Sequence, residues 1–153
     1  MVDAVDRKIL SKLQENGRLT HGQLADHLGL SVCACHRRVK QLEERGVITG
    51  YSAIVDRTKL DLKVLAYIFI KLDAHTQTTL SEFEKRIAQM KEVVACHAVS
   101  GGGDYILKVI AEDMDAFADI ALKQLARLPG LKDSSSNFVL STLKESPGWP
   151  AEI

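Results

Sequence analysis

The sequence has little of what marks an unusual class of protein. Aromatic residues make up 5% of its 153 residues, three are proline, and 20 basic side chains balance 20 acidic ones. The hydrophobic share of 46% is that of a folded globular chain, which excludes intrinsic disorder. No apolar run approaches the roughly 18 residues that cross a bilayer, and charges interrupt the first ten positions, where a signal peptide needs an apolar core. We therefore expect a cytoplasmic protein without a membrane partner.

Cysteine is also scarce. Cys33, Cys35 and Cys96 are odd in number and irregularly spaced, so they predict no disulfide framework. Histidines directly follow Cys35 and Cys96, which raises the alternative of a metal site. On a helix, however, Cys33 and Cys35 point about 200° apart and do not grip one ion together. We expect free thiols, with no metal and no other cofactor.

The balance of charged residues differs between the two halves of the chain. Residues 1–60 hold ten Lys/Arg against seven Asp/Glu, whereas residues 61–153 hold ten against thirteen. A nearly neutral whole can therefore carry a basic surface suited to an anionic partner. We expect a first domain at 1–55, a polar linker at 56–63 and a second domain at 64–153.

Three helix signals occupy the first 45 residues. The first apolar repeat stops at Asn16-Gly17, and Thr20 with Gln23 matches a capping box for a second helix. Ser31 is a good N-cap for a third helix, whose apolar positions are Cys35, Val39 and Leu42. The short turn before Ser31 has the spacing of a helix-turn-helix. The β-branched and aromatic stretch 47–55 favours a strand or hairpin, which would be the wing of a winged helix-turn-helix.

The third helix presents hydrogen-bond donors on the surface opposite its apolar positions. Arg and Lys bind guanine edges or phosphates, and the N-terminal turn of a helix binds a phosphate oxygen, so this surface suits the major groove. An ordinary solvated helix surface is the alternative, and one arginine could instead pair with a local carboxylate. The candidate DNA-binding residues are Ser31, Val32, Cys33, His36, Arg37, Arg38, Lys40 and Gln41.

The second half alternates strand and helix patterns. Strands are predicted at 64–72, 93–99, 105–111 and 137–143, with helical stripes at 80–90 and 117–128. The order βαββαβ predicts an α+β, ferredoxin-like domain. Its sheet would bury one face under the helices and need a cover for the other, which a partner sheet could supply. We therefore expect a dimer.

Two segments of this half are candidate ligand sites. Gly101, Gly102 and Gly103 separate two strands and lead into Asp104, a backbone that can present bare N–H groups to a ligand. An ordinary hairpin turn is the alternative, and the spacing of a phosphate-binding loop is absent. The stretch 133–137 offers hydroxyls, although a polar loop entering the last strand is the simpler interpretation. No histidine is spaced with a nucleophile, so no catalytic site is expected.

Several motifs together resemble the Lrp/AsnC family of bacterial and archaeal transcription regulators. They include Asp6-Arg7-Lys8-Ile9-Leu10, Leu28-Gly29-Leu30-Ser31, Gly46-Val47-Ile48-Thr49-Gly50-Tyr51, Gly101-Gly102-Gly103-Asp104-Tyr105 and Leu128-Pro129-Gly130. The resemblance runs from about residue 3 to about residue 145 in the family's order. It implies a winged helix-turn-helix that binds double-stranded DNA in the nucleoid, and a second domain that senses amino acids and dimerises, with dimers commonly assembling into octamers.

The resemblance also implies a ligand site between dimers. Gly101, Gly103 and Asp104 would form one wall, with Asp104 receiving the ligand's ammonium, and Ser134 and Ser136 of a neighbouring subunit would form the other.

In this turn Gly102 and Gly103 stand where relatives often have an acidic and an aromatic residue, which predicts a roomier or looser pocket. Two rivals to an effector-gated regulator are a haem-biosynthesis decarboxylase of similar architecture and an architectural DNA-compacting protein without an effector.

Overall fold

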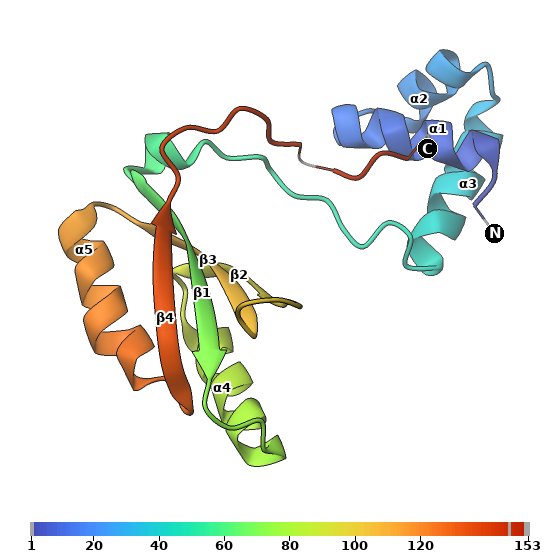
Figure 1. Ribbon diagram of the computed structural model, residues 1–153. Helices are drawn as coiled ribbons and strands as arrows, with labels where there is room; N and C mark the ends of the chain where they lie inside the picture. Colours follow the sequence, from blue (N-terminus) through green and yellow to red (C-terminus); the bar gives the residue numbers. More distant parts are fainter. Residues whose placement is uncertain (1, 147, 152–153) are drawn as a thin grey trace. The chain divides into compact units, whose positions relative to one another are not determined.

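The chain divides into two compact units, Met1–Ile54 with Lys144–Ile153 and Val55–Leu143. The computed structural model describes residues 2–146 and 148–151, and Figure 1 traces the elements of each unit along the sequence. No helix within the described residues is long and apolar enough to span a membrane. Each unit has a hydrophobic core of its own.

The first unit is built from three helices, α1 (Ala4–Glu15), α2 (His21–Leu28) and α3 (Val32–Glu44). The predicted caps are confirmed, since the Thr20 hydroxyl accepts from the Gln23 N–H and the Ser31 hydroxyl accepts from the Ala34 N–H, both at 3.2 Å. One apolar stripe from each helix meets in the core, which buries Ile9, Leu24, Ala25, Cys35, Val39 and Leu42. The predicted helix-turn-helix is therefore present.

Residues 47–55, for which the sequence favours a strand or hairpin, form no regular strand. The N–H groups of Val47 and Ile48 both donate to the Leu42 carbonyl, at 2.9 and 3.1 Å, and close the end of α3. A strand needs a neighbour that satisfies its backbone groups, and none of the strands in the described part of the chain pairs with this segment. Its β-branched residues therefore give an irregular segment, with exposed Tyr51 and Ile54.

The second unit has the predicted βαββαβ order. After a short 3-10 turn (Arg57–Leu60) come β1 (Val64–Leu72), α4 (Gln77–Gln89), β2 (Val93–Ala98), β3 (Tyr105–Ala111), α5 (Met114–Asp119) and β4 (Leu131–Phe138). Helix α5 continues through a π-helical turn (Ile120–Gln124) and a 3-10 turn (Leu125–Arg127). The antiparallel sheet has the order β2-β3-β1-β4, so β1, green in Figure 1, lies between β3 and β4.

The last strand begins six residues, and ends five residues, earlier than predicted. The sequence places it at 137–143, whereas β4 covers Leu131–Phe138 and contains the stretch expected to be a polar loop. Leu140 and Leu143, which lie within the predicted span, are each 97% exposed. An edge strand is held by its hydrogen bonds to one neighbour, here β1, so a run of serines forms a strand without an apolar pattern.

The two faces of the sheet differ in what covers them. Ala66, Ile68, Ile70 and Leu72 of β1 are buried in a core with Phe83 and Phe117 of the helices. The alternate side chains of β1 face the other way, and Tyr67 and Phe69 remain 36% and 38% exposed. Cross-strand pairing places neighbours of these two residues on the same face. We call this face the open face, and it comprises Tyr67, Phe69, Ile106, Lys108, Ser135 and Asn137.

Candidate nucleic-acid interface and ligand turn

Helix α3 carries the candidate nucleic-acid interface. Because Cys35, Val39 and Leu42 are buried, the opposite side of the helix is left in solvent. Seven of the candidates from the sequence are exposed there or at the N-cap: Ser31, Val32, Cys33, His36, Arg37, Lys40 and Gln41. The structure therefore brings these side chains together on one surface.

Arg38, the eighth candidate, is engaged within the unit. Its guanidinium Nη1 donates to Asp3 Oδ2 at 2.7 Å and to Asp6 Oδ1 at 2.8 Å. Asp6 is buried, and the two carboxylates also form the capping box of α1. The Asp6 N–H and the Arg38 guanidinium both hold the pKa of the Asp3 carboxyl below its ordinary value. Arg38 thus ties α3 to the start of α1, the local pairing that the sequence left open.

The other basic side chains of α3 form weaker interactions within the unit than Arg38 does. Lys40 Nζ lies 3.7 Å from Glu44 Oε1 at the surface, a distance that contributes little in water. The His36 ring packs edge-on against His21, with centroids 4.8 Å apart. The part of the chain that the structure describes holds no partner for the Arg37 guanidinium, so among Arg37, Arg38 and Lys40 it is Arg37 that is free to bind an anion.

The cysteines form no bond with each other in the described structure. Cys33 is exposed and Cys35 is buried, and burial raises the pKa of the Cys35 thiol. Among residues 2–146 and 148–151, no three His, Cys, Asp or Glu side chains are grouped so that they could hold a metal ion.

The glycine turn between β2 and β3 is attached to the end of β1. The Asp104 N–H donates to the Ile70 carbonyl at 2.8 Å, and Asp104 Oδ2 accepts from the Leu72 N–H at 2.7 Å. A Cβ on Gly103 would lie 3.2 Å from the Ile70 carbonyl oxygen, so the backbones approach more closely than a side chain comfortably allows. At Gly101 the backbone has φ of 124°, which favours glycine. Local geometry thus favours glycine at two of the three positions, Gly101 and Gly103.

The Asp104 carboxylate has a second partner that sequence reasoning missed. His75, in the connection between β1 and α4, places Nε2 3.0 Å from Asp104 Oδ1. The Leu72 N–H, and next the His75 ring, hold the pKa of the Asp104 carboxyl below its ordinary value. Both oxygens are therefore occupied within the chain. The 29 residues that separate His75 from Asp104 in sequence offer no spacing signal for this contact.

A hollow of about 510 Å³ lies beside the glycine turn. It is lined by Phe69, Val99, Ser100, Gly102, Gly103 and Ser135. Ser135 pairs with Phe69 and so shares the open face, whereas Ser134 and Ser136 pair with Ile70 and Ile68 and share the helix-covered side. Within one chain, the residue of β4 brought to the turn is therefore Ser135, which the sequence did not single out.

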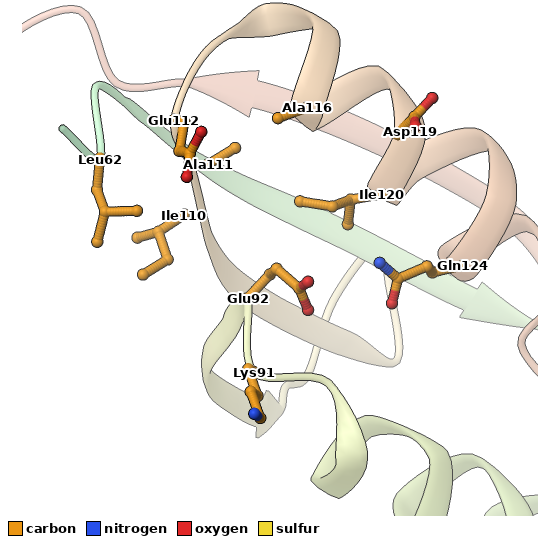
Figure 2. A pocket seen from close by; sticks show the side chains of 10 residues that line it. All are labelled: Leu62, Lys91, Glu92, Ile110, Ala111, Glu112, Ala116, Asp119, Ile120 and Gln124. Atoms are coloured by element: carbon orange, nitrogen blue, oxygen red, sulfur yellow. The ribbon is translucent and has the colours of Figure 1, made fainter. Parts of the chain in front are cut away.

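A second hollow, of about 480 Å³, lies between α5, the end of β3 and the turn before β2 (Figure 2). Ile110 and Ile120 contribute apolar surface, and Glu92, Asp119 and Gln124 surround it. Asp119 is bonded to Lys123 at 2.7 Å. None of the candidates from the sequence lines this hollow.

Comparison with known proteins agrees with the two-part organisation. Residues 65–149 match the Lrp/AsnC ligand binding domain, and residues 2–49 match a winged helix-turn-helix DNA-binding family. The Leucine-responsive regulatory proteins of Klebsiella pneumoniae and Escherichia coli (strain K12) are each 35% identical over 145 residues, which cover 95% of this chain and 88% of theirs.

Solved structures of similar chains extend the likeness to three dimensions. A transcriptional regulator from Neisseria meningitidis, solved as an L-Met complex, has a TM-score of 0.95 at 34% identity, covering 99% of this chain and 98% of its own. An AsnC family transcriptional regulator from Agrobacterium tumefaciens has a TM-score of 0.92 at 34% identity, covering 97% and 96%. These relatives are regulators of transcription rather than enzymes. This chain belongs to the Lrp/AsnC family and is a DNA-binding transcription regulator with a ligand-binding domain.

Proposed function

We propose that an amino acid bound between dimers at the glycine turn changes how this protein assembles and binds DNA. In this account it acts in the cytoplasm, associated with the nucleoid, as a homodimer that assembles further to an octamer. The observation that carries the proposal is the glycine turn itself: its backbone is fastened to β1 by Asp104, next to a hollow, in a domain of a ligand-binding family.

The open face supports assembly through the sheet. Tyr67 and Phe69 are large apolar side chains left more than a third exposed next to Ile106, and a second copy of the sheet would remove them from water. A two-fold axis would also present two copies of α3 to the DNA. Successive major grooves on one side of the duplex lie roughly 34 Å apart, which sets the spacing that the two helices must reach.

The exposed surface of α3 supports DNA binding through specific side chains. Arg37 and Lys40 carry positive charge toward solvent, and Gln41 can both donate to and accept from a base edge. Ser31 caps α3, whose N-terminal N–H groups suit a phosphate oxygen. We assign Arg38 to the framework of this interface, because Asp3 and Asp6 hold it in place.

The ligand turn supports recognition of a zwitterion. Gly101, Gly102 and Gly103 offer backbone N–H groups to a carboxylate, and Asp104 offers a carboxylate to an ammonium. The Neisseria meningitidis relative was solved in complex with an amino acid, L-Met, which agrees with that chemistry. We propose that Ser134 and Ser136 of a neighbouring dimer complete the site.

A gel-shift titration tests the proposal. The DNA upstream of the protein's own gene is titrated at two salt concentrations, with and without a pool of amino acids. Retarded complexes whose affinity or laddering changes with the pool support an effector-gated regulator. Specific complexes that ignore every amino acid favour an architectural DNA-binding protein, and the absence of any specific complex contradicts both.

A further inference from the structure

The connection between β1 and α4 holds His75 in a defined place. The Asp73 N–H donates to the Gly130 carbonyl at 2.9 Å, and the Thr76 side chain accepts from the Thr79 N–H at 3.2 Å to cap α4. A Cβ on Gly130 would lie 2.5 Å from the Thr79 methyl of α4 and 3.3 Å from Asp73 Oδ1, so both the start of α4 and the connection pack closely against the turn before β4. His75 is therefore presented from a braced loop rather than a free one.

From this loop the imidazole reaches one oxygen of Asp104. Nε2 lies 3.0 Å from Oδ1, while Oδ2 is taken by the Leu72 N–H. The His75 side chain is 58% exposed, so protons exchange with solvent and a ligand can displace the ring. Oδ1 is thus the oxygen that an incoming ammonium must share with His75 or take from it.

We infer that His75 is a built-in competitor for the effector's ammonium: when protonated, it occupies the Asp104 carboxylate that an amino acid needs. The inference rests on the effector role proposed for the glycine turn. An imidazolium is a cation with an N–H donor, which is the chemistry that an ammonium brings to a carboxylate. When His75 loses its proton the ring keeps at most a neutral hydrogen bond, which a charged ligand replaces more easily.

Other charges around His75 do not replace Asp104. Lys71 of β1 acts on Asp104 as a second, weaker cation and lies opposite Asp133 of β4. Asp73, on the same loop as His75, has an oxygen against the Gly130 turn, where a Cβ would lie 3.3 Å away. The Asp104 carboxylate, 3.0 Å from Nε2, is therefore the group that holds protonated His75 over the glycine turn.

Competition by His75 predicts that the affinity for the effector depends on pH. Histidine is the side chain whose charge changes between about pH 5 and pH 8, while amino acids stay zwitterionic across this range. As the pH falls, His75 gains its proton and the carboxylate becomes occupied, so the effector affinity falls. Because at most one proton is linked to binding, the affinity changes by no more than tenfold per pH unit, and we expect weaker binding at about pH 5.5 than at about pH 7.5.

Calorimetry of the full-length protein with L-methionine and L-leucine as probes tests the inference. In His75→Gln, which keeps an N–H donor but removes the titrating charge, we expect binding at about pH 5.5 to recover to its strength at about pH 7.5. His27→Gln, at another exposed histidine, is the matched control and should keep the pH dependence. The inference would be overturned if the wild-type affinity did not change with pH. It would also be overturned if His75→Gln still bound the amino acid more weakly at low pH.

A second measurement separates the inference from the proposed function. The pKa of the Asp104 carboxyl, followed by carbon NMR without any ligand, should rise in His75→Gln, because a neutral amide replaces the ring whose charge helps to lower it. If neither amino acid binds at any pH, the proposed function fails for these probes, and this measurement decides the inference alone. An Asp104 pKa unaltered by His75→Gln shows that the ring does not occupy the carboxylate.

Discussion

The Arg38 guanidinium lies 2.8 Å from the buried carboxylate of Asp6, and this ion pair joins the middle of α3 to the first turn of α1. Because Asp6 is buried, removing Arg38 leaves a carboxylate without its cation. We predict that Arg38→Gln lowers the free energy of unfolding by about 1 kcal/mol. Urea titration measures this change. An unfolding free energy equal to that of the wild type would show that the pair contributes nothing to the unit.

Arg37, the neighbouring residue on α3, should behave in the opposite way. Its guanidinium is exposed, so Arg37→Ala should leave stability within about 0.5 kcal/mol of the wild type. If it binds a phosphate, the substitution weakens DNA binding across all sequences and lowers the slope of log affinity against log salt by about one unit. Fluorescence anisotropy at several salt concentrations checks this. An unchanged slope would assign Arg37 to a solvated surface.

The glycine turn offers a matched pair of substitutions. Gly103→Ala pushes a methyl against the Ile70 carbonyl, which the Asp104 N–H holds in place, and should lower the free energy of unfolding by about 1 kcal/mol. Gly102 has no atom within 4 Å of an added Cβ and no left-handed φ, so Gly102→Ala should be neutral or slightly stabilising. Denaturation of both variants in urea compares them. Equal effects would mean that the approach of the turn to β1 is not tight.

Assembly through the open face has its own test. Phe69→Glu puts a charge in place of apolar surface beside Tyr67 and Ile106, where a partner sheet would have to remove that charge from water, and should weaken the dimer. Leu122, exposed on the π-helical turn, provides the control, since Leu122→Glu should leave assembly intact. Sedimentation velocity gives the answer. A Phe69→Glu protein that still sediments as the wild-type assembly contradicts burial of this face.

The lowered pKa of the Asp104 carboxyl predicts a loss of stability in acid. A carboxyl whose pKa is depressed by folding stabilises the folded state above its ordinary value near 3.8, and this contribution is lost as the pH falls through the depressed value. In Asp104→Asn the contribution is absent, so the stability difference from the wild type should shrink as the pH drops below about 4. Thermal unfolding across this range measures it. A constant difference would contradict the ionised role of Asp104 in the turn.

Local patterns predicted the elements whose residues decide their own conformation. The caps at Thr20 and Ser31 and the apolar strands at 64–72 and 105–111 were correct, because side chains within each segment supply the signal. The predictions for β4 and for segment 47–55 were wrong. Residues 131–136 form a strand because β1 lies beside them, whereas segment 47–55 forms none because no strand pairs with it in the described structure. That difference lies outside each segment and leaves no mark in its sequence.

The candidate sites divide in the same way. The exposed surface of α3 followed from helical periodicity, which sequence reveals directly. The partners of Arg38 and Asp104 did not, since Asp6 and His75 reach them from 32 and 29 residues away in sequence, through tertiary packing. Ser135 was missed for a related reason: which serine of β4 faces the glycine turn depends on its pairing register with β1.

The central claim is that an effector and DNA act on each other through this protein, and one titration tests it most directly. The affinity for DNA is measured by fluorescence anisotropy with and without a saturating amino acid that calorimetry has shown to bind. Coupling of about 1–3 kcal/mol predicts that the two affinities differ by roughly 5- to 150-fold. Two superimposable curves would contradict the account, because a ligand with equal affinity for free and DNA-bound protein regulates nothing.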